Sequence, residues 1–278
     1  MISLIDLDPL VYQYGYLQLP DGRVFPPKMA ASMLDDKIEE IRIKSGGDTW
    51  QGHISGVGNF RNSVATIRTY KGTRSESERP PLYGYLRGHL MQKPNVVIAN
   101  GEEADDTLSI AQYKAWKHDG RGTSRELESD AGIFEDEYMP SRCSTVICTI
   151  DKDLDMVPGL HYRWSKGNVK EICTWYQDVD NGLLCFYRQC LTGDSVDNIP
   201  GLRCIGPKSA HLNNLAFLEP VRRFSYVQDR YKEWYGNYGD EFLLEVGRLL
   251  WMRSEVGEMW SFPKDSRNHP ELTLSNNI

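Results

Sequence analysis

The most informative stretch of this chain is Gly193-Asp194-Ser195-Val196-Asp197-Asn198-Ile199-Pro200-Gly201-Leu202-Arg203-Cys204-Ile205-Gly206-Pro207-Lys208-Ser209-Ala210. Its two carboxylates are followed by an Asn-Ile-Pro-Gly break and then by a Gly-Pro-Lys-Ser step. Proline is favoured in the first turn of a helix, so this step predicts that a new helix begins here. A turn between two helices offers backbone N–H groups, and here a lysine, to a phosphate. Acids beside such a turn indicate metal ions that act on a nucleic-acid backbone.

Carboxylates also follow three other predicted strands. Apolar or β-branched runs at 2–5, 96–99 and 144–150 predict buried strands, and acids come after each of them. A single acid there is explained by turn capping or by the helix dipole, but parallel strands bring all of them to one edge. The candidate metal ligands are Asp6, Glu103, Asp105, Asp106, Asp151, Asp153, Asp194 and Asp197. Converging acids of this number require divalent cations, and all-oxygen ligation without His or Cys indicates Mg²⁺ or Mn²⁺.

Basic residues concentrate between positions 61 and 93, where seven Lys or Arg residues accompany only two Glu residues. The centre of this segment is Tyr70-Lys71-Gly72-Thr73-Arg74, and a Pro-Pro break follows at 80–81. A run of cations is usually a solvated surface. Interleaved tyrosines favour a second interpretation, because cations and aromatic rings together bind single-stranded nucleic acid.

The overall composition is that of a globular protein of 278 residues, with 40% hydrophobic residues and a net charge of −7. The negative charge alone argues against nucleic acid as a partner, but the charge is segregated along the chain. Between positions 119 and 137 there are seven acidic and two basic residues, which predicts an exposed insertion near 118–142. The six cysteines lack metal-binding spacing and are expected to be buried, reduced thiols. No apolar run has the roughly 20 residues needed to span a bilayer, and no signal peptide is visible.

Apolar periodicity predicts the remaining elements. Helices are expected near 28–45, 104–116, 182–191, 208–218, 220–234 and 239–252, and short strands near 51–55 and 160–164. Four aromatic residues of the C-terminal helical region, Trp234, Tyr235, Tyr238 and Trp251, are expected to lie in its core.

The segment Gly193–Gly201 resembles the helix–three-turn–helix signature of the flap endonuclease / 5′→3′ exonuclease family. That family includes small bacteriophage enzymes and the 5′-nuclease domain of bacterial DNA polymerase I. Three further motifs match it in order: Tyr-Lys-Gly-x-Arg at 70–74, Glu-Ala-Asp-Asp at 103–106 and Asp-Lys-Asp at 151–153. The family usually has glycine where this chain has Cys204. Because glycine suits a left-handed turn better than cysteine does, a distorted turn is expected.

The resemblance implies an α/β fold, with a PIN-like core whose mostly parallel sheet is flanked by helices. Residues 1–180 would form this catalytic core, with a helical arch near 61–93 and the acidic insertion near 118–142. Residues 181–278 would form a helical region that binds duplex DNA through the helix–three-turn–helix. A K⁺ ion at that turn is a further expectation.

The resemblance also implies a Mg²⁺-dependent 5′→3′ exonuclease and 5′-flap endonuclease that hydrolyses DNA by a two-metal mechanism. In that family the lysine and arginine of the 70–74 motif contact the scissile phosphate, so the catalytic residues would be Lys71 and Arg74. The DNA-binding residues would be Arg61, Tyr70, Gly201, Gly206, Lys208 and Ser209. The expected partner is DNA with 5′ ends, flaps or nicks, or RNA in RNA–DNA hybrids. A monomer in the cytoplasm of a phage-infected bacterium is expected. A PIN-type endoribonuclease and a non-catalytic DNA-binding replication factor remain as alternatives.

Overall fold

A six-stranded sheet forms the centre of the computed structural model, which describes residues 1–73, 79–119, 143–167 and 170–263. Its strands are β1 (Ile2–Asp6), β2 (Thr49–Ser55), β3 (Val96–Ala99), β4 (Thr145–Cys148), β5 (Gly159–Arg163) and β6 (Ile172–Gln177). The strand order is β3-β2-β1-β4-β5-β6, and all neighbours are parallel except β5 and β6. The expected mostly parallel α/β sheet is therefore confirmed, and the acids that follow β1, β3 and β4 reach the same edge.

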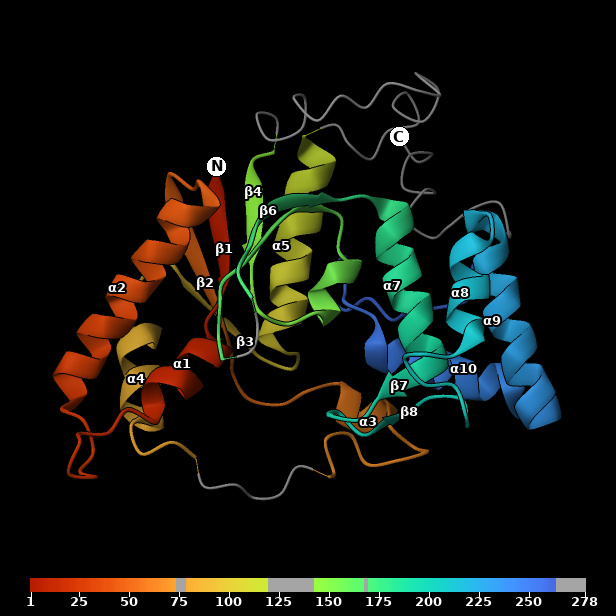
Figure 1. Cartoon of the computed structure of the whole chain (residues 1–278), viewed down its shortest axis with the longest axis horizontal. Coiled ribbons are helices and arrows are strands. Elements are labelled where there is room, and N and C mark those ends of the chain that lie inside the picture. The colour runs from red at the N-terminus through yellow and green to blue at the C-terminus, as the bar shows by residue number, and fades with distance from the viewer. Residues whose placement is uncertain (74–78, 120–142, 168–169, 264–278) are drawn as a thin grey trace.

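Helices cover both faces of this sheet (Figure 1). One face carries α1 (Asp8–Gly15), α2 (Pro27–Ser45) and α4 (Tyr83–Met91), and the other carries α5 (Ala104–His118). Side chains of a strand alternate between the two faces. In β1, Leu4 accordingly joins the core around α5, whereas Ile5 joins the core under α1 and α2.

The C-terminal part of the chain is helical, as expected, and packs onto the α5 side of the sheet. It contains α7 (Val179–Thr192), α8 (Ala210–Phe217), α9 (Pro220–Tyr235), the short η4 turn (Gly236–Tyr238) and α10 (Gly239–Leu250). A two-stranded ribbon, β7 (Gly193–Asp194) and β8 (Ile199–Pro200), links α7 to the turn before α8. One apolar cluster runs from Leu4 and Ile147 of the sheet to Leu243 of α10. The suggested boundary near residue 180 falls at the start of α7 and inside this shared core.

Several expectations need correction. Helix α1 and strand β6 were not anticipated, and Trp234 and Tyr238 are 49% and 64% exposed rather than buried in a core. All six cysteines lie in the described residues and are free thiols, but Cys173 and Cys204 are exposed. Most of the expected insertion, residues 120–142, lies outside the described residues. No helix in the described part of the chain is long and apolar enough to cross a membrane.

Candidate active site

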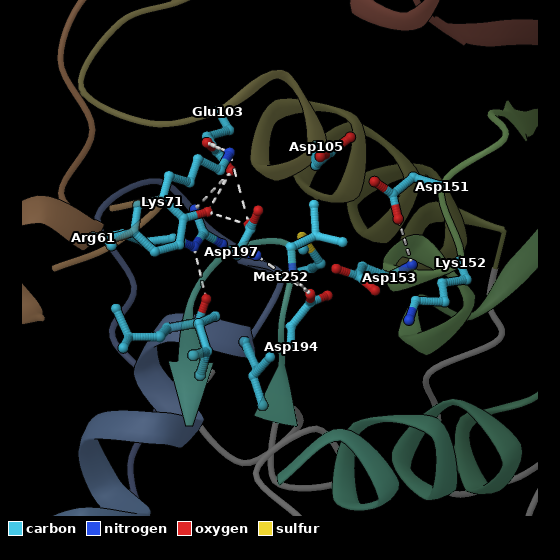
Figure 2. Close-up of a pocket in the computed structure, with 15 residues that line it drawn as sticks. Arg61, Lys71, Glu103, Asp105, Asp151, Lys152, Asp153, Asp194, Asp197 and Met252 are labelled. Carbon is cyan, nitrogen blue, oxygen red and sulfur yellow. Dashed lines mark hydrogen bonds and ion pairs between the residues drawn. The ribbon is translucent and has the colours of Figure 1, made fainter. Parts of the chain in front are cut away.

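A cavity of about 130 Å³ lies at the edge of the sheet where the parallel strands end. Segments far apart in the sequence meet there, as Figure 2 shows: Lys71 and Glu103 lie on one side of the cavity, and Asp151 and Asp153 on the other. Its wall is formed by Arg61, Tyr70, Lys71, Glu103, Asp105, Asp151, Lys152, Asp153, Asp194, Val196, Asp197, Ile199, Leu249, Leu250 and Met252. Six of the eight predicted metal ligands line this cavity directly, and the other two, Asp6 and Asp106, lie behind it.

The ends of β1 and β4 are joined by a hydroxyl group. The Thr149 hydroxyl donates to Asp6 Oδ2 at 2.9 Å and accepts the backbone N–H of Asp151 at 3.0 Å. Burial raises the pKa of the Asp6 carboxyl well above its ordinary value, and repulsion from Asp8 and Asp151 adds to this rise. The pKa of Asp151 is also raised, chiefly by burial. These two neighbouring strands thus deliver acids whose negative charge is poorly compensated.

The first turn of α5 carries two acids, Asp105 and Asp106, in different surroundings. Asp105 points to the cavity, and burial together with repulsion from Asp6 and Asp151 raises its pKa well above normal. Asp106 is 0% exposed and accepts Arg61 Nη1 and Nη2 at 2.5 and 2.9 Å. Asp106 also accepts the backbone N–H of Glu103 at 3.1 Å, which completes a capping box at the start of α5. Asp105 therefore faces the cavity, while Asp106 holds an arginine behind it.

Asp153 begins the short η3 turn (Asp153–Met156). Its carboxylate accepts a hydrogen bond from a distant part of the chain. Gln189 of α7 donates from Nε2 to Asp153 Oδ1 at 2.5 Å, and the backbone N–H of Asp153 donates to Asp151 Oδ1 at 2.9 Å. Burial, followed by repulsion from Asp151 and Asp194, raises the pKa of Asp153 to about 7. The sheet side of the cavity therefore contains several acids that resist ionisation together.

The ribbon supplies the opposite wall. Asp194 Oδ1 accepts the backbone N–H groups of Val196 at 2.7 Å and Asp197 at 3.3 Å, so the acid stabilises the ribbon's own loop. Asp197 accepts the Tyr70 hydroxyl at 2.7 Å, and Lys71 Nζ lies 3.7 Å from the same carboxylate. Lys71 also forms a close ion pair with Glu103. On this wall, a lysine already balances the acids.

The segment before Lys71 is fastened to the ribbon by its backbone. Asn198 Nδ2 donates to the Thr69 carbonyl at 2.9 Å, and the Lys71 N–H donates to the Asp197 carbonyl at 2.8 Å. Lys71 and Asn198 both adopt left-handed backbone conformations, with φ of 55° and 59°. Such conformations are uncommon for residues with side chains, and they persist where surrounding contacts fix them. The position of Lys71 is therefore set by the ribbon.

The carboxylate oxygens of the cavity suit a hard cation, although they are widely spaced. Within the described ranges, no three carboxylate, imidazole or thiol groups lie close enough together to hold a single ion. Mg²⁺ keeps several of its waters, so acids spaced around a cavity of this size can hold it partly through water. Burial is the main cause of the raised pKa values of Asp105, Asp151 and Asp153, and a divalent cation would remove the repulsion between acids that adds to it. The residues present fit Mg²⁺ or Mn²⁺ on these grounds.

Two residues of the predicted basic site, Arg61 and Tyr70, are placed differently from the expectation. Arg61 is 1% exposed, and its guanidinium also donates to the carbonyls of Leu249 and Trp251, so it offers no surface to a phosphate. Tyr70 is 7% exposed, with its hydroxyl between Asp197 and Glu103, so its ring does not face solvent for stacking. Arg74 lies outside the described residues.

The helix–three-turn–helix segment is divided between the cavity, which Asp194 and Asp197 line, and the surface turn that follows Gly201. Leu202 and Ile205 anchor the turn in the core, while Gly206 and Lys208 are exposed. A Cβ on Gly206 would meet nothing within 4 Å, whereas one on Gly201 would lie 2.1 Å from the Thr192 carbonyl carbon. Gly201 is therefore required by packing, and Gly206 leaves open space for an approaching phosphate.

The turn before α8 has a capped helix start and one left-handed residue. The Ser209 hydroxyl accepts the backbone N–H of His211 at 3.3 Å and caps α8. Cys204 has φ of 66°, so the turn keeps the left-handed conformation that glycine would adopt. The cysteine therefore adopts a backbone conformation that is strained for a residue with a Cβ.

Sequence reasoning missed three residues of the site. Gln189 holds Asp153, Asn198 holds the Thr69 carbonyl, and Lys152 lines the cavity between two acids. Lys152 lies inside the Asp-Lys-Asp motif at 151–153, and Asn198 lies inside the Gly193–Gly201 segment. Their positions within these motifs could have identified both as residues of the site. Gln189 lies 36 residues from its partner on a helix without any motif, so nothing in the sequence pointed to it.

Neither a protein-family model nor a curated protein matches this sequence. Solved structures do match. T5 5′-exonuclease with bound divalent zinc ions is 17% identical, with 90% of this chain and 88% of that chain covered and a TM-score of 0.57. A point mutant of the same exonuclease gives 16% identity, 90% and 86% coverage and a TM-score of 0.56. A bacteriophage T5 flap endonuclease, in a pseudo-enzyme–product complex with DNA and metal ions, is 15% identical, with 90% of this chain and 98% of that chain covered and a TM-score of 0.51. The chain therefore has the fold of the 5′-exonucleases and flap endonucleases of bacteriophage T5.

Proposed function

We propose that this protein is a divalent-metal-dependent nuclease that hydrolyses DNA phosphodiesters at 5′ ends and 5′ flaps. One observation carries the proposal: acids with raised pKa values and a clamped lysine line one cavity at the carboxyl edge of the sheet. Placing several buried acids together is unfavourable for stability, and such clusters mark sites where the charge is used. A scissile phosphate held between metal ions and a lysine accounts for both kinds of group.

The sheet side of the cavity would hold the metal. Asp105, Asp151 and Asp153 would be the principal ligands, with Asp194 facing them from the ribbon. When bound, a pair of Mg²⁺ ions supplies Lewis acidity to an attacking water and to the leaving 3′-oxygen. Mn²⁺ has the same preference for oxygen ligands and is expected to substitute.

The chain's own residues orient the substrate. Lys71, fixed by the ribbon, would place its positive charge against the non-bridging oxygens of the phosphate, where negative charge accumulates during displacement. This requires Lys71 to exchange part of its ion pair with Glu103 for the phosphate. Asp6 and Thr149 would keep the neighbouring Asp151 backbone in place, and Arg61 would keep the start of α5 in place through Asp106.

Duplex DNA would be held at the helix–three-turn–helix, remote from the cut. Lys208 and the open backbone around Gly206 would contact phosphates there, and a K⁺ ion would bind at the same turn. The substrate would be DNA with 5′ ends, nicks or flaps, with RNA–DNA hybrids as a further substrate. A monomer acting in the cytoplasm of a phage-infected bacterium completes the proposal.

The test is digestion of 5′-labelled flap, nicked and single-stranded DNA with Mg²⁺, with Mn²⁺ and in EDTA. The expected result is cleavage near the 5′ end that EDTA abolishes and Mg²⁺ restores, with Asp151→Asn inactive although it still binds duplex. Cleavage that persists in chelator would refute the metal mechanism. Cutting of RNA hairpins without DNA flaps would identify a PIN-type ribonuclease instead, and binding without any cleavage would identify a replication factor.

A further inference from the structure

Three acids of the cavity, Asp151, Asp153 and Asp194, each have one carboxylate oxygen occupied by a donor of the protein itself. Asp151 Oδ1 accepts the backbone N–H of Asp153 at 2.9 Å, and Asp153 Oδ1 accepts Nε2 of Gln189. Asp194 Oδ1 accepts two backbone N–H groups of its own loop. Among the described residues, no donor forms a hydrogen bond to Oδ2 of any of these acids. Each of the three therefore keeps a single oxygen for a cation.

Gln189 differs from the other donors because it is a side chain from a distant helix. The backbone donors are fixed by the turns to which they belong, whereas Gln189 lies on α7, 36 residues from Asp153. Helix α7 approaches η3 closely, since a Cβ on Gly182 would lie 2.4 Å from the Met156 carbonyl oxygen. Gln189 follows Gly182 by about two helical turns and so lies on the same face of α7. The packing of α7 on η3 therefore sets the reach of Gln189 to Asp153.

The amide of Gln189 has a hydrogen-bond partner at only one end. Its Oε1 is buried and, within the described residues, accepts no hydrogen bond. An ionised carboxylate only accepts, so the amide must turn Nε2 toward Asp153 and leave Oε1 unpaired. An unpaired buried oxygen is unfavourable for stability. The contact with Asp153 is thus retained against stability, which indicates that it serves the site.

We propose that Gln189 makes the metal site selective for Mg²⁺ and Mn²⁺ over Ca²⁺. Because it occupies Oδ1, Asp153 can bind a cation through Oδ2 alone. Mg²⁺ is bound through few carboxylates in a near-octahedral arrangement, whereas Ca²⁺ takes more oxygens and often binds both oxygens of one carboxylate. Gln189 is a positioning residue, since it acts on the cation through Asp153. This inference rests on the proposed function and deepens it, because it concerns the metal of the same site.

The test measures the affinity of the DNA-free protein for MnCl₂ and for CaCl₂ by isothermal titration calorimetry. Gln189→Met keeps the length of the side chain and releases Asp153 Oδ1. Loss of a partner that orients a metal ligand weakens metal binding about 10–100-fold, so the affinity for Mn²⁺ should fall by that factor. The affinity for Ca²⁺ should stay constant or rise, because both oxygens of Asp153 become available. The preference for Mn²⁺ over Ca²⁺ should therefore fall at least about 10-fold. A change in how readily Asp153 ionises would affect both cations alike and cancels in this ratio.

The matched control is Gln228→Met. Gln228 Nε2 also donates to an aspartate, Asp240 Oδ1 at 2.9 Å, but between α9 and α10 and away from the residues that line the cavity. Gln189→Asn, whose amide is one methylene shorter, is a second variant and should lose the preference as Gln189→Met does. A preference that is unchanged in both Gln189 variants, or that changes equally in Gln228→Met, would overturn the proposal.

Cleavage of a 5′ flap in Mg²⁺ tests the enzyme separately. A protein whose preference for Mn²⁺ depends on Gln189 but that never cleaves DNA refutes only the nuclease. A protein that cleaves flaps while Gln189→Met leaves the preference unchanged refutes only the role of Gln189.

Discussion

Asp153→Asn is expected to stabilise the metal-free protein while it removes cleavage activity. Burial and neighbouring acids raise the pKa of Asp153 from 3.8 to about 7, so ionising this group in the folded state is costly. At about 1.4 kcal/mol per pKa unit, the cost reaches about 4 kcal/mol at alkaline pH. Asparagine keeps an oxygen that can accept from Gln189 and carries no charge. For a chain of this size, such a gain corresponds to a melting temperature higher by about 8–16 °C as an upper bound.

The sign of the pH dependence follows from linkage. Because the folded-state pKa of Asp153 is raised, the folded state binds more protons than the unfolded state between about pH 4 and pH 7, and stability falls as pH rises through that range. The difference between variant and wild type should be less than about 2 kcal/mol at pH 5 and about 4 kcal/mol at pH 8. Differential scanning calorimetry or urea unfolding in EDTA, at both pH values, measures it.

Adding Mg²⁺ should reverse the order. The wild type gains stability from binding the ion, because a ligand that binds only the folded state stabilises it, and the variant gains less. Asp229→Asn, which changes an exposed acid on α9, is the control and should alter neither profile. An Asp153→Asn protein with no advantage at pH 8, or with the same advantage at pH 5, would refute the view that Asp153 is held in a repelling cluster.

Four other variants test separate parts of the structure. Lys71→Ala should lower the single-turnover cleavage rate about 10²–10³-fold, while equilibrium duplex binding in Ca²⁺ stays nearly constant; a loss of affinity alone would contradict the catalytic role. Asn198→Ala should reduce turnover about 10²-fold without weakening duplex binding, because it releases the segment that positions Lys71. Cys204→Gly should raise stability by about 1–2 kcal/mol by relieving the left-handed strain, whereas Cys204→Ala should not, and urea unfolding distinguishes them. Burial lowers the pKa of His161 to about 4 in the folded state. Below about pH 6.5 the unfolded state therefore binds a proton that the folded state does not, and the free energy of unfolding falls by up to about 3 kcal/mol. His161→Gln should make the loss of stability between about pH 6.5 and pH 4.5 smaller.

The meeting of the acids was predictable from sequence because it depends on topology. A run such as 96–99 is recognisable as a buried strand, and parallel strands end at one edge whatever their order in the sheet. The helices after residue 179 were predicted from apolar periodicity, whereas the order of the strands in the sheet was not predicted. Helix α1 was missed because it begins directly after β1 with Asp8-Pro9 and has only eight residues. Strand β6 was missed because it is an edge strand in which three of the six residues are exposed and polar and apolar residues do not alternate clearly.

The partners of the charged residues were not predictable. Sequence spacing shows that Arg61 and Asp106 lie 45 residues apart, but not that the two would be buried against each other. The same applies to Tyr70, whose hydroxyl meets Asp197 across 127 residues. Motifs assign a chemical type to each position, whereas the direction of a side chain depends on tertiary packing. The burial of Arg61 and Tyr70 is the clearest difference between the expected site and the structure.

The charge of the chain is best understood from the site itself. The six acids that line the cavity, together with Asp6 and Asp106 behind it, exceed the neighbouring cations Arg61, Lys71 and Lys152 by five, against a net charge of −7 for the whole chain. Most of the negative charge that argues against a polyanionic partner is thus gathered in and directly behind one cavity. Two divalent ions would neutralise nearly all of that excess and leave the rest of the surface close to neutral. Metal binding would then govern not only the chemical step but also whether a phosphate can approach Lys71 at all, so the affinity for DNA ends should rise with the occupancy of the metal site.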